Sequence, residues 1–285
     1  MTVLWSGGRL HEPDAALVVG VDHGLTVGDG VFETCGVVDG HAFALTRHLR
    51  RLERSAVGLG LAAPDEGEVR AGVAAVLAAE PTAGRVRVTV TGGPGPLGSN
   101  RNAPADQRLT VIVLAGPAVR HDVARAVRVP WVRNERSAVA GLKTTSYAEN
   151  VVALAEAYRR GADEALLANT VGELCEGTGS NVFVERDGEL VTPPLSSGCL
   201  AGITRELLLE WGAAAGLPVR EGRPGELGES VLDDVLAGDA HLALSGSVRN
   251  VVPVVTLDER DVAAGPLSRE AQALFLARMV EHVDP

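Results

Sequence analysis

The sequence contains almost no lysine: its 26 basic residues are 25 arginines and the single lysine Lys143. Positive charge is also in deficit, because 37 acidic residues leave a net charge of −11. An acidic chain without a basic stripe argues against binding nucleic acid or an anionic membrane surface. No apolar run approaches the ~18–20 residues that cross a bilayer, and no charged-then-apolar leader follows Met1. We therefore expect a cytoplasmic protein without a membrane partner.

Cysteine is scarce as well, with Cys35, Cys175 and Cys199 far apart and no C-x-x-C pair. This pattern argues against a disulfide framework and against a zinc site, so we expect three buried, reduced thiols. The seven histidines are isolated, without H-E-x-x-H, and no metal is predicted. The sequence also lacks the G-x-S-x-G elbow of serine hydrolases and the P-loop of nucleotide triphosphatases.

Apolar periodicity predicts both strands and helices. The 285 residues suit one large domain or two ordinary ones. Asp39-Gly40 and Asp187-Gly188 are typical of tight hairpin turns. Helical spacing is predicted from Thr46 to about Gly58, and over 66–79, 146–160, 203–215, 228–237 and 268–282. Because strands and helices alternate without a regular βαβ rhythm, the fold class is predicted to be α+β.

A polar segment punctuated by Gly and Pro at 116–126 separates two apolar strands. We expect a smaller N-terminal α/β domain over 1–118, a linker over 119–126, and a larger C-terminal domain over 127–285. The larger domain would then carry Lys143.

Three local features indicate one kind of chemistry. Arginine keeps its proton in proteins, whereas the amine of Lys143 can act as a nucleophile or base. Gly202 precedes a helix whose first N–H groups could bind a phosphate, although an ordinary helix start has the same pattern. Glu173 and Glu176 face opposite sides of an extended strand, so at most one points at a given site, and both could equally lie on the surface.

A reactive amine, a phosphate-binding helix start, an arginine and an inward carboxylate are together what pyridoxal phosphate requires. The amine forms the imine with the cofactor. The carboxylate keeps the ring nitrogen protonated, so that the ring can accept electrons from the substrate.

Five ordered segments resemble the class IV aminotransferases, which are fold-type IV pyridoxal-phosphate enzymes. These segments are DHGLTVGDGVFET (22–34), RHLRRLERSA (47–56), GLKTTSYAENVVALAEA (141–157), ELCEGTGSNVFV (173–184) and SGCLAGITR (197–205). The family includes branched-chain and D-amino-acid aminotransferases and 4-amino-4-deoxychorismate lyase. The resemblance implies two α/β domains with the cofactor between them, and a homodimer.

The resemblance also implies roles for individual residues. Lys143 matches the lysine that forms the Schiff base and later moves a proton at the substrate. Glu176 matches the carboxylate that faces the pyridine nitrogen. Four further positions match residues that bind the cofactor phosphate: Arg51, in the pattern H-x-x-R-L, Ile203, Thr204 and Ser247.

Three positions match residues that contact the substrate. Thr34 agrees with the lyase, Gly246 agrees with the aminotransferases, and Arg87 stands where the lyase has lysine and the branched-chain enzymes have arginine. An inward Arg87 could bind a substrate carboxylate through two hydrogen bonds. Val27 replaces an aromatic residue and Gly36 an arginine of the family, which implies a larger and less polar pocket.

The favoured function is amino transfer between an amino acid or amine and a 2-oxo acid. The alternative is a lyase that releases pyruvate from aminodeoxychorismate to give 4-aminobenzoate. A nucleotide-binding module using the G-x-G-x-x-G at Gly93–Gly98 is a third interpretation. Pro94 and Pro96 argue against it, because a dinucleotide site needs a helix to open there.

Overall fold

The computed structural model describes all 285 residues, which group into two compact units. Unit 1 contains Met1–Val119, Leu142–Tyr147 and His282–Pro285, and unit 2 contains Arg120–Gly141 and Ala148–Glu281. Lys143 thus groups with unit 1, whereas the sequence-based division placed it in 127–285. The linker over 119–126 stays a prediction.

Unit 1 is built on one antiparallel six-stranded sheet with the order β2-β1-β6-β5-β3-β4. Its strands are β1 (Val3–Ser6), β2 (Arg9–His11), β3 (Gly30–Val38), β4 (His41–Ala42), β5 (Arg85–Thr91) and β6 (Thr110–Gly116). Its helices are α1 (His23–Thr26), α2 (Leu45–Leu59), α3 (Glu66–Ala79) and the short 3-10 helix Pro104–Asp106.

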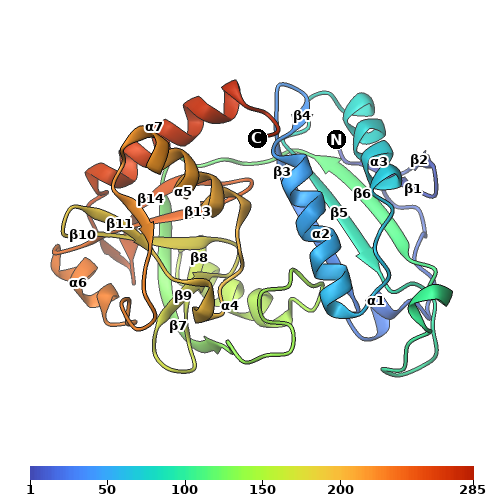
Figure 1. Cartoon of the computed structure of the whole chain (residues 1–285), viewed down its shortest axis with the longest axis horizontal. Helices are drawn as coiled ribbons and strands as arrows, with labels where there is room; N and C mark the ends of the chain where they lie inside the picture. The colour runs from blue at the N-terminus through green and yellow to red at the C-terminus, as the bar shows by residue number, and fades with distance from the viewer. The chain divides into compact units, whose positions relative to one another are not determined.

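Helices α2 and α3 lie over the same face of this sheet (Figure 1). Side chains alternate between the two faces of a strand, so Val86, Val88 and Val90 of β5 are buried in the core beneath the helices. Arg87 and Thr89 therefore point to the opposite face, where both are half-buried. The alternation therefore gives the sheet one face that packs against α2 and α3 and an opposite face with half-buried polar side chains.

Local sequence signals account for the ends of these elements. The predicted helix over 66–79 is confirmed, and the Asp65 carboxylate caps it by accepting a hydrogen bond from the Glu68 N–H at 3.0 Å. At the β3–β4 turn, Asp39 and Gly40 have φ values of 48° and 78°. Positive φ at both central residues is typical of a type I′ turn, which agrees with the predicted tight hairpin.

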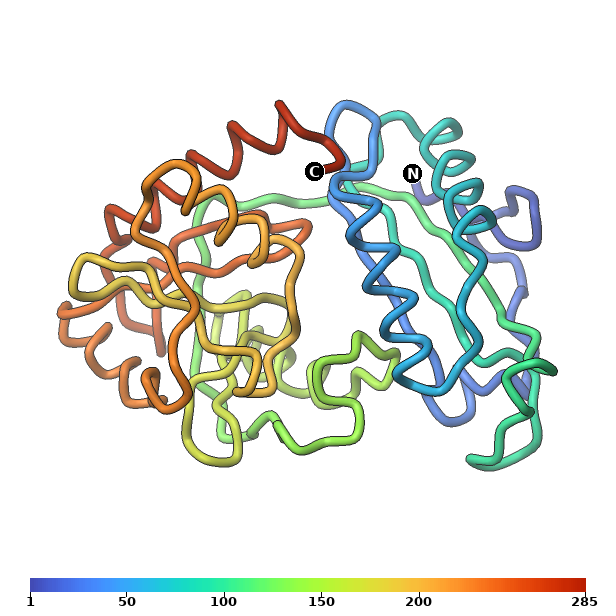
Figure 2. Tube along the Cα trace, in the orientation of Figure 1, coloured from blue at the N-terminus to red at the C-terminus, as the bar shows by residue number.

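Unit 2 contains a nine-stranded mixed sheet with the order β12-β11-β10-β13-β14-β7-β8-β9, and β15 pairs with β14. The strands are β7 (Ala124–Arg133), β8 (Glu164–Asn169), β9 (Leu174–Gly177), β10 (Asn181–Arg186), β11 (Glu189–Thr192), β12 (Val219–Glu221), β13 (His241–Gly246), β14 (Asn250–Leu257) and β15 (Arg260–Asp261). The helices are α4 (Ala148–Arg159), α5 (Ile203–Ala215), α6 (Val231–Ala237), α7 (Pro266–Glu281) and a 3-10 turn at Leu195–Ser197. Figure 2 traces the chain through these elements from green to red.

The mixture of helices with largely antiparallel sheets confirms the α+β class. Strands β7, β8 and β14 add parallel pairs to the second sheet. Helix α5 covers the predicted range 203–215, beginning after Gly202 and ending at Gly216 with φ 78°. The three cysteines are free and buried, as expected. No helix is both long and apolar enough to cross a membrane.

Candidate active site

The segment that carries Lys143 is bound to strand β3. The Lys143 carbonyl accepts a hydrogen bond from the Phe32 N–H at 3.1 Å, and the Thr145 N–H donates to the Gly30 carbonyl at 2.8 Å. The Lys143 N–H donates to the Ser55 hydroxyl of α2 at 3.2 Å. The lysine backbone is therefore fixed by both a strand and a helix of unit 1.

The amine of Lys143 lies among aromatic rings. Its Nζ is 4.4 Å from the centre of the Phe32 ring and 5.8 Å from that of Tyr147. The two rings meet edge to face, with centres 5.2 Å apart. Lys143 is half-buried, so its nitrogen does not extend into bulk solvent from a flexible stem.

Arg51 is buried in an ionic cluster on α2. Its Nε and Nη2 donate to the two oxygens of Glu33, both at 2.7 Å, and Nδ1 of His48 lies 2.6 Å from the same carboxylate. Burial acts to raise the pKa of Glu33, but the charge and hydrogen bonds of Arg51, with a smaller contribution from His48, hold it far below its usual value. Glu33 thus orients the predicted phosphate arginine through two hydrogen bonds.

The predicted substrate residues of unit 1 are neighbours. Thr34 on β3 is directly opposite Arg87 on β5, so both side chains lie on the face away from α2 and α3. The Arg87 guanidinium lies 3.9 Å from the centre of the Phe32 ring. The Arg87 guanidinium and the Lys143 amine therefore both lie close to the Phe32 ring, and Thr34 is the cross-strand neighbour of Arg87.

Glu176 on β9 has two strong contacts. Its Oε1 accepts a hydrogen bond from Nε of Arg133 at 3.1 Å, and its Oε2 accepts from the Leu200 N–H at 2.9 Å. Glu173 instead binds Asn169 Nδ2 and the Gly225 N–H. The two carboxylates thus have different partners, but not through simple alternation, because the β8–β9 register shifts between the pairs of Glu176 and Leu174.

The predicted residues of unit 2 converge on the segment 177–181, which follows Glu176. A Cβ on Gly202 would lie 1.9 Å from Asn181 Oδ1, and one on Gly246 would lie 3.2 Å from the Gly179 carbonyl oxygen. Asn181 Nδ2 also donates to the Leu200 carbonyl at 2.8 Å. Segment 177–181 therefore directly follows Glu176 and also lies beside the start of α5 and the turn that holds Ser247.

This part of unit 2 fits a phosphate-bearing cofactor. The first N–H groups of α5, including those of Ile203 and Thr204, have no partner within the helix. Ser245 lies directly opposite Asn181 across β13 and β10, and its buried hydroxyl has no hydrogen-bond partner. A buried polar atom without a partner costs free energy unless a bound group supplies one.

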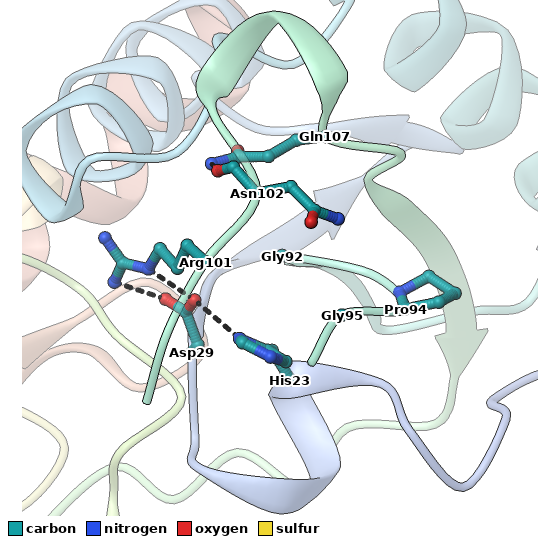
Figure 3. Close-up of a pocket in the computed structure, with 8 residues that line it drawn as sticks. All are labelled: His23, Asp29, Gly92, Pro94, Gly95, Arg101, Asn102 and Gln107. Carbon is teal, nitrogen blue, oxygen red and sulfur yellow. Dashed lines mark hydrogen bonds and ion pairs between the residues drawn. The ribbon is translucent and has the colours of Figure 1, made fainter. Parts of the chain in front are cut away.

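The glycine-rich loop after β5 does not form a nucleotide site. No helix opens at Gly98; the chain continues as a loop to the 3-10 turn at Pro104–Asp106. The pocket beside this loop has a volume of about 10 Å³ and is lined by His23, Asp29, Gly92, Pro94, Gly95, Arg101, Asn102 and Gln107. Figure 3 shows Arg101 directed at Asp29, to which it donates two hydrogen bonds of 2.6 Å. This volume suits about one water rather than a nucleotide.

Comparison with known proteins decides the family. The family profile "Amino-transferase class IV" matches residues 30–257. The chain belongs to the class IV aminotransferases.

Individual relatives agree with this assignment. A Methanocaldococcus jannaschii protein with a provisional branched-chain-amino-acid aminotransferase name is 31% identical over 91% of this chain and 89% of its own. The D-alanine aminotransferase of Bacillus licheniformis is 27% identical over 95% of both chains. A bifunctional aminodeoxychorismate lyase and D-amino acid transaminase of Mycobacterium tuberculosis is 30% identical over 73% of this chain and 77% of its own.

Solved structures share the fold of this aminotransferase. A fold IV-transaminase from Curtobacterium pusillum has a TM-score of 0.81 at 31% identity, covering 98% of this chain and 100% of its own. A hypothetical aminotransferase from Mycobacterium tuberculosis in its PLP-bound form has a TM-score of 0.83 at 26% identity, covering 99% of both chains. The aminotransferase is a pyridoxal-phosphate-dependent transaminase of fold type IV.

Sequence reasoning missed several partners within the site of this aminotransferase. Glu33 holds the predicted residue Arg51 in place, and Arg133, which is itself bonded to Asn150, holds Glu176. A signal for Glu33 exists in the sequence, since a carboxylate within the apolar strand GVFETCGVV needs a buried partner. Nothing local marks Arg133, because its partner Glu176 is 43 residues away.

Proposed function

We propose that the transaminase binds pyridoxal phosphate through the residues that the sequence singled out: Lys143, Glu176, Arg51, Ile203, Thr204 and Ser247. The observation that carries the proposal is the convergence of Glu176, the start of α5 and the Gly246 turn on segment 177–181. This supports the proposal because the segments that carry the carboxylate, the helix-start amides and Ser247 are far apart in sequence and yet lie beside one segment.

Pyridoxal phosphate supplies an aldehyde that condenses with amines and a protonated ring that accepts electrons. The Lys143 amine would hold the cofactor covalently and move a proton at the substrate Cα. Glu176 would accept a hydrogen bond from the ring nitrogen. Arg51, the first amides of α5 and the Ser247 hydroxyl would bind the phosphate.

The substrates are an amino acid and a 2-oxo acid, as in the family. We propose that Arg87 binds the carboxylate of either one, with Thr34 beside it. Arg87 suits this role because it is half-buried and lies within 3.9 Å of the centre of the Phe32 ring that also contacts the Lys143 amine. Gly246 is the third proposed substrate residue; a Cβ there would lie 3.2 Å from the Gly179 carbonyl oxygen.

The lone lysine makes the proposal easy to test. Borohydride reduction of the cofactor-loaded protein should fix the cofactor irreversibly to the peptide that contains Lys143. Because no other lysine exists, the only competing amine is the N-terminal one. Lys143→Ala should lose both the covalent label and transamination while keeping the fold, as checked by circular dichroism. Label retained in Lys143→Ala would overturn the assignment.

A lyase activity is a second candidate, favoured by the bifunctional Mycobacterium tuberculosis relative. Incubation with aminodeoxychorismate alone, followed by a pyruvate assay, separates the two activities. Release of pyruvate without an added 2-oxo acid would establish a lyase. A strict requirement for an amino acceptor would exclude it.

We further propose that the enzyme is a homodimer in the cytoplasm. The dimer rests on the family resemblance, and sedimentation velocity tests it. The three free, buried cysteines suit a reducing compartment. Fractionation of the native cells tests the location.

A further inference from the structure

Arg133 ends strand β7 and contacts the carboxylate assigned to the cofactor ring. Its Nε donates to Glu176 Oε1 at 3.1 Å. The side chains of Arg133 and Glu176 are 19% and 11% exposed, so this ion pair is largely withdrawn from water. A pair in this environment interacts more strongly than one on the surface.

Glu176 is held at two points. Arg133 binds one oxygen, and the Leu200 N–H binds the other at 2.9 Å. These donors come from a strand and from the segment that precedes α5. Two donors on different oxygens restrict rotation of the carboxylate about its last bond, which a single donor would not do.

Arg133 is itself held in place by Asn150 of α4. Its Nη1 donates to Asn150 Oδ1 at 3.2 Å, and Asn150 Nδ2 donates to the Thr178 carbonyl at 2.6 Å. Asn150 is 5% exposed. These two hydrogen bonds therefore connect Arg133 through Asn150 to segment 177–181, which directly follows Glu176. The exposed Glu149 adds a weaker contact to Arg133 at 3.7 Å.

We propose that Arg133 is a positioning residue that keeps the Glu176 carboxylate ionised and holds it in the orientation in which it faces the cofactor ring. The inference rests on the proposed role of Glu176. A guanidinium keeps its charge at all working pH values, so it favours the ionised carboxylate throughout. An ionised Glu176 can only accept a hydrogen bond from the ring, which requires a protonated ring nitrogen.

The experiment is a double-mutant cycle on the full chain with Arg133→Met and Glu176→Gln. Each protein is loaded with pyridoxal phosphate, and three quantities are measured: the visible absorption spectrum of the bound cofactor, its dissociation constant by equilibrium dialysis, and kcat with KM. Arg136→Met is the matched control, because Arg136 lies three residues away with an 82% exposed side chain paired to Glu135.

The expected result for Arg133→Met is an altered cofactor spectrum and a kcat about 10- to 100-fold lower with little change in KM. This range corresponds to losing a hydrogen bond between charged groups. Glu176→Gln should change the spectrum in the same direction and lower kcat at least as much. Adding Arg133→Met to Glu176→Gln should lower kcat further by less than about threefold, because the two act as one unit. Arg136→Met should match the wild type.

The outcomes separate the two levels of the argument. If Glu176→Gln leaves the spectrum and kcat unchanged, the proposed role of Glu176 fails. If Glu176→Gln has its effect but Arg133→Met behaves like Arg136→Met, the positioning role alone is refuted. The positioning role would also be refuted if Arg133→Met lowered kcat as much in the Glu176→Gln protein as in the wild type. Should Arg133→Met fail to fold, Arg133→Lys takes its place, because it keeps the charge but loses the fork of donors. Its spectrum and kcat should lie between those of the wild type and of Glu176→Gln, and values equal to the wild type would refute the positioning role.

Discussion

Glu33→Gln tests the ionic cluster that orients Arg51. The substitution keeps the shape of the side chain but removes its charge and replaces one acceptor oxygen by a donor. Arg51 is only 3% exposed, and the two hydrogen bonds that it donates to Glu33 both measure 2.7 Å. The variant therefore leaves a guanidinium buried without its anion and turns an amide N–H toward the donors of Arg51 or His48.

The magnitude follows from the burial. Removing one partner of a buried ion pair costs about 3–5 kcal/mol of folding free energy, because the remaining charge is uncompensated. For a chain of this size the apparent unfolding temperature should fall by roughly 6–20 °C. Replacing both partners, as in Glu33→Gln with Arg51→Met, should recover much of the loss, since no buried charge remains.

The assay is thermal unfolding of the cofactor-free protein, followed by circular dichroism. Glu53→Gln is the matched control, because Glu53 lies on the exposed side of the same helix α2. A Glu33→Gln protein that melts within about 2 °C of the Glu53→Gln control would show that the cluster is not electrostatically coupled as argued.

Acidification should destabilise the protein in two stages, first as His48 and then as Glu33 becomes protonated. Burial lowers the pKa of His48 below 6.5 despite the Glu33 carboxylate, and Arg51 lowers the pKa of Glu33. Both groups therefore bind protons more readily in the unfolded chain, so their contribution to stability is complete above about pH 6.5 and is lost as the pH falls. Urea unfolding measured from pH 7 to pH 4 tests this, and a midpoint that stays constant over this range would contradict it. Gly202→Ala should lower the free energy of unfolding by about 1–3 kcal/mol, because the new Cβ would clash with Asn181 Oδ1. Thermal unfolding measures the loss, and Gly20→Ala is the control because a Cβ at Gly20 has no atom within 4 Å. Arg101→Met should speed amide hydrogen exchange across 92–107, because it removes the two hydrogen bonds to Asp29, while 66–79 stays protected. Equal exchange rates across 92–107 in the variant and the wild type would show that the loop does not depend on this ion pair.

Local chemistry predicted much of the secondary structure. Helices over 66–79 and 203–215 begin and end where predicted, since Asp65 and Gly202 precede them and Gly216 ends the second. The hairpin turn at Asp187-Gly188 follows from residues that tolerate positive φ. Signals of this kind act within a few residues along the chain, so a single sequence reveals them.

The sequence also singled out the groups able to do the chemistry. One lysine among 26 basic residues, a glycine before a helix and a carboxylate in an apolar strand are visible without coordinates. Alternation along an extended strand predicted only that Glu173 and Glu176 face opposite sides, and the family resemblance singled out Glu176. The shift in the β8–β9 register breaks that simple alternation, so the sequence alone does not give the partners of either carboxylate.

Only the tertiary structure decided which charged groups meet. Arg51 pairs with Glu33 because α2 packs over β3, and Arg133 pairs with Glu176 because both belong to one sheet through β7, β8 and β9. The lysine segment joins unit 1 through backbone hydrogen bonds to β3, more than a hundred residues earlier in the chain. Such pairings depend on strand order and helix packing, which are cooperative properties of the whole fold, and residue spacing carries no direct record of them.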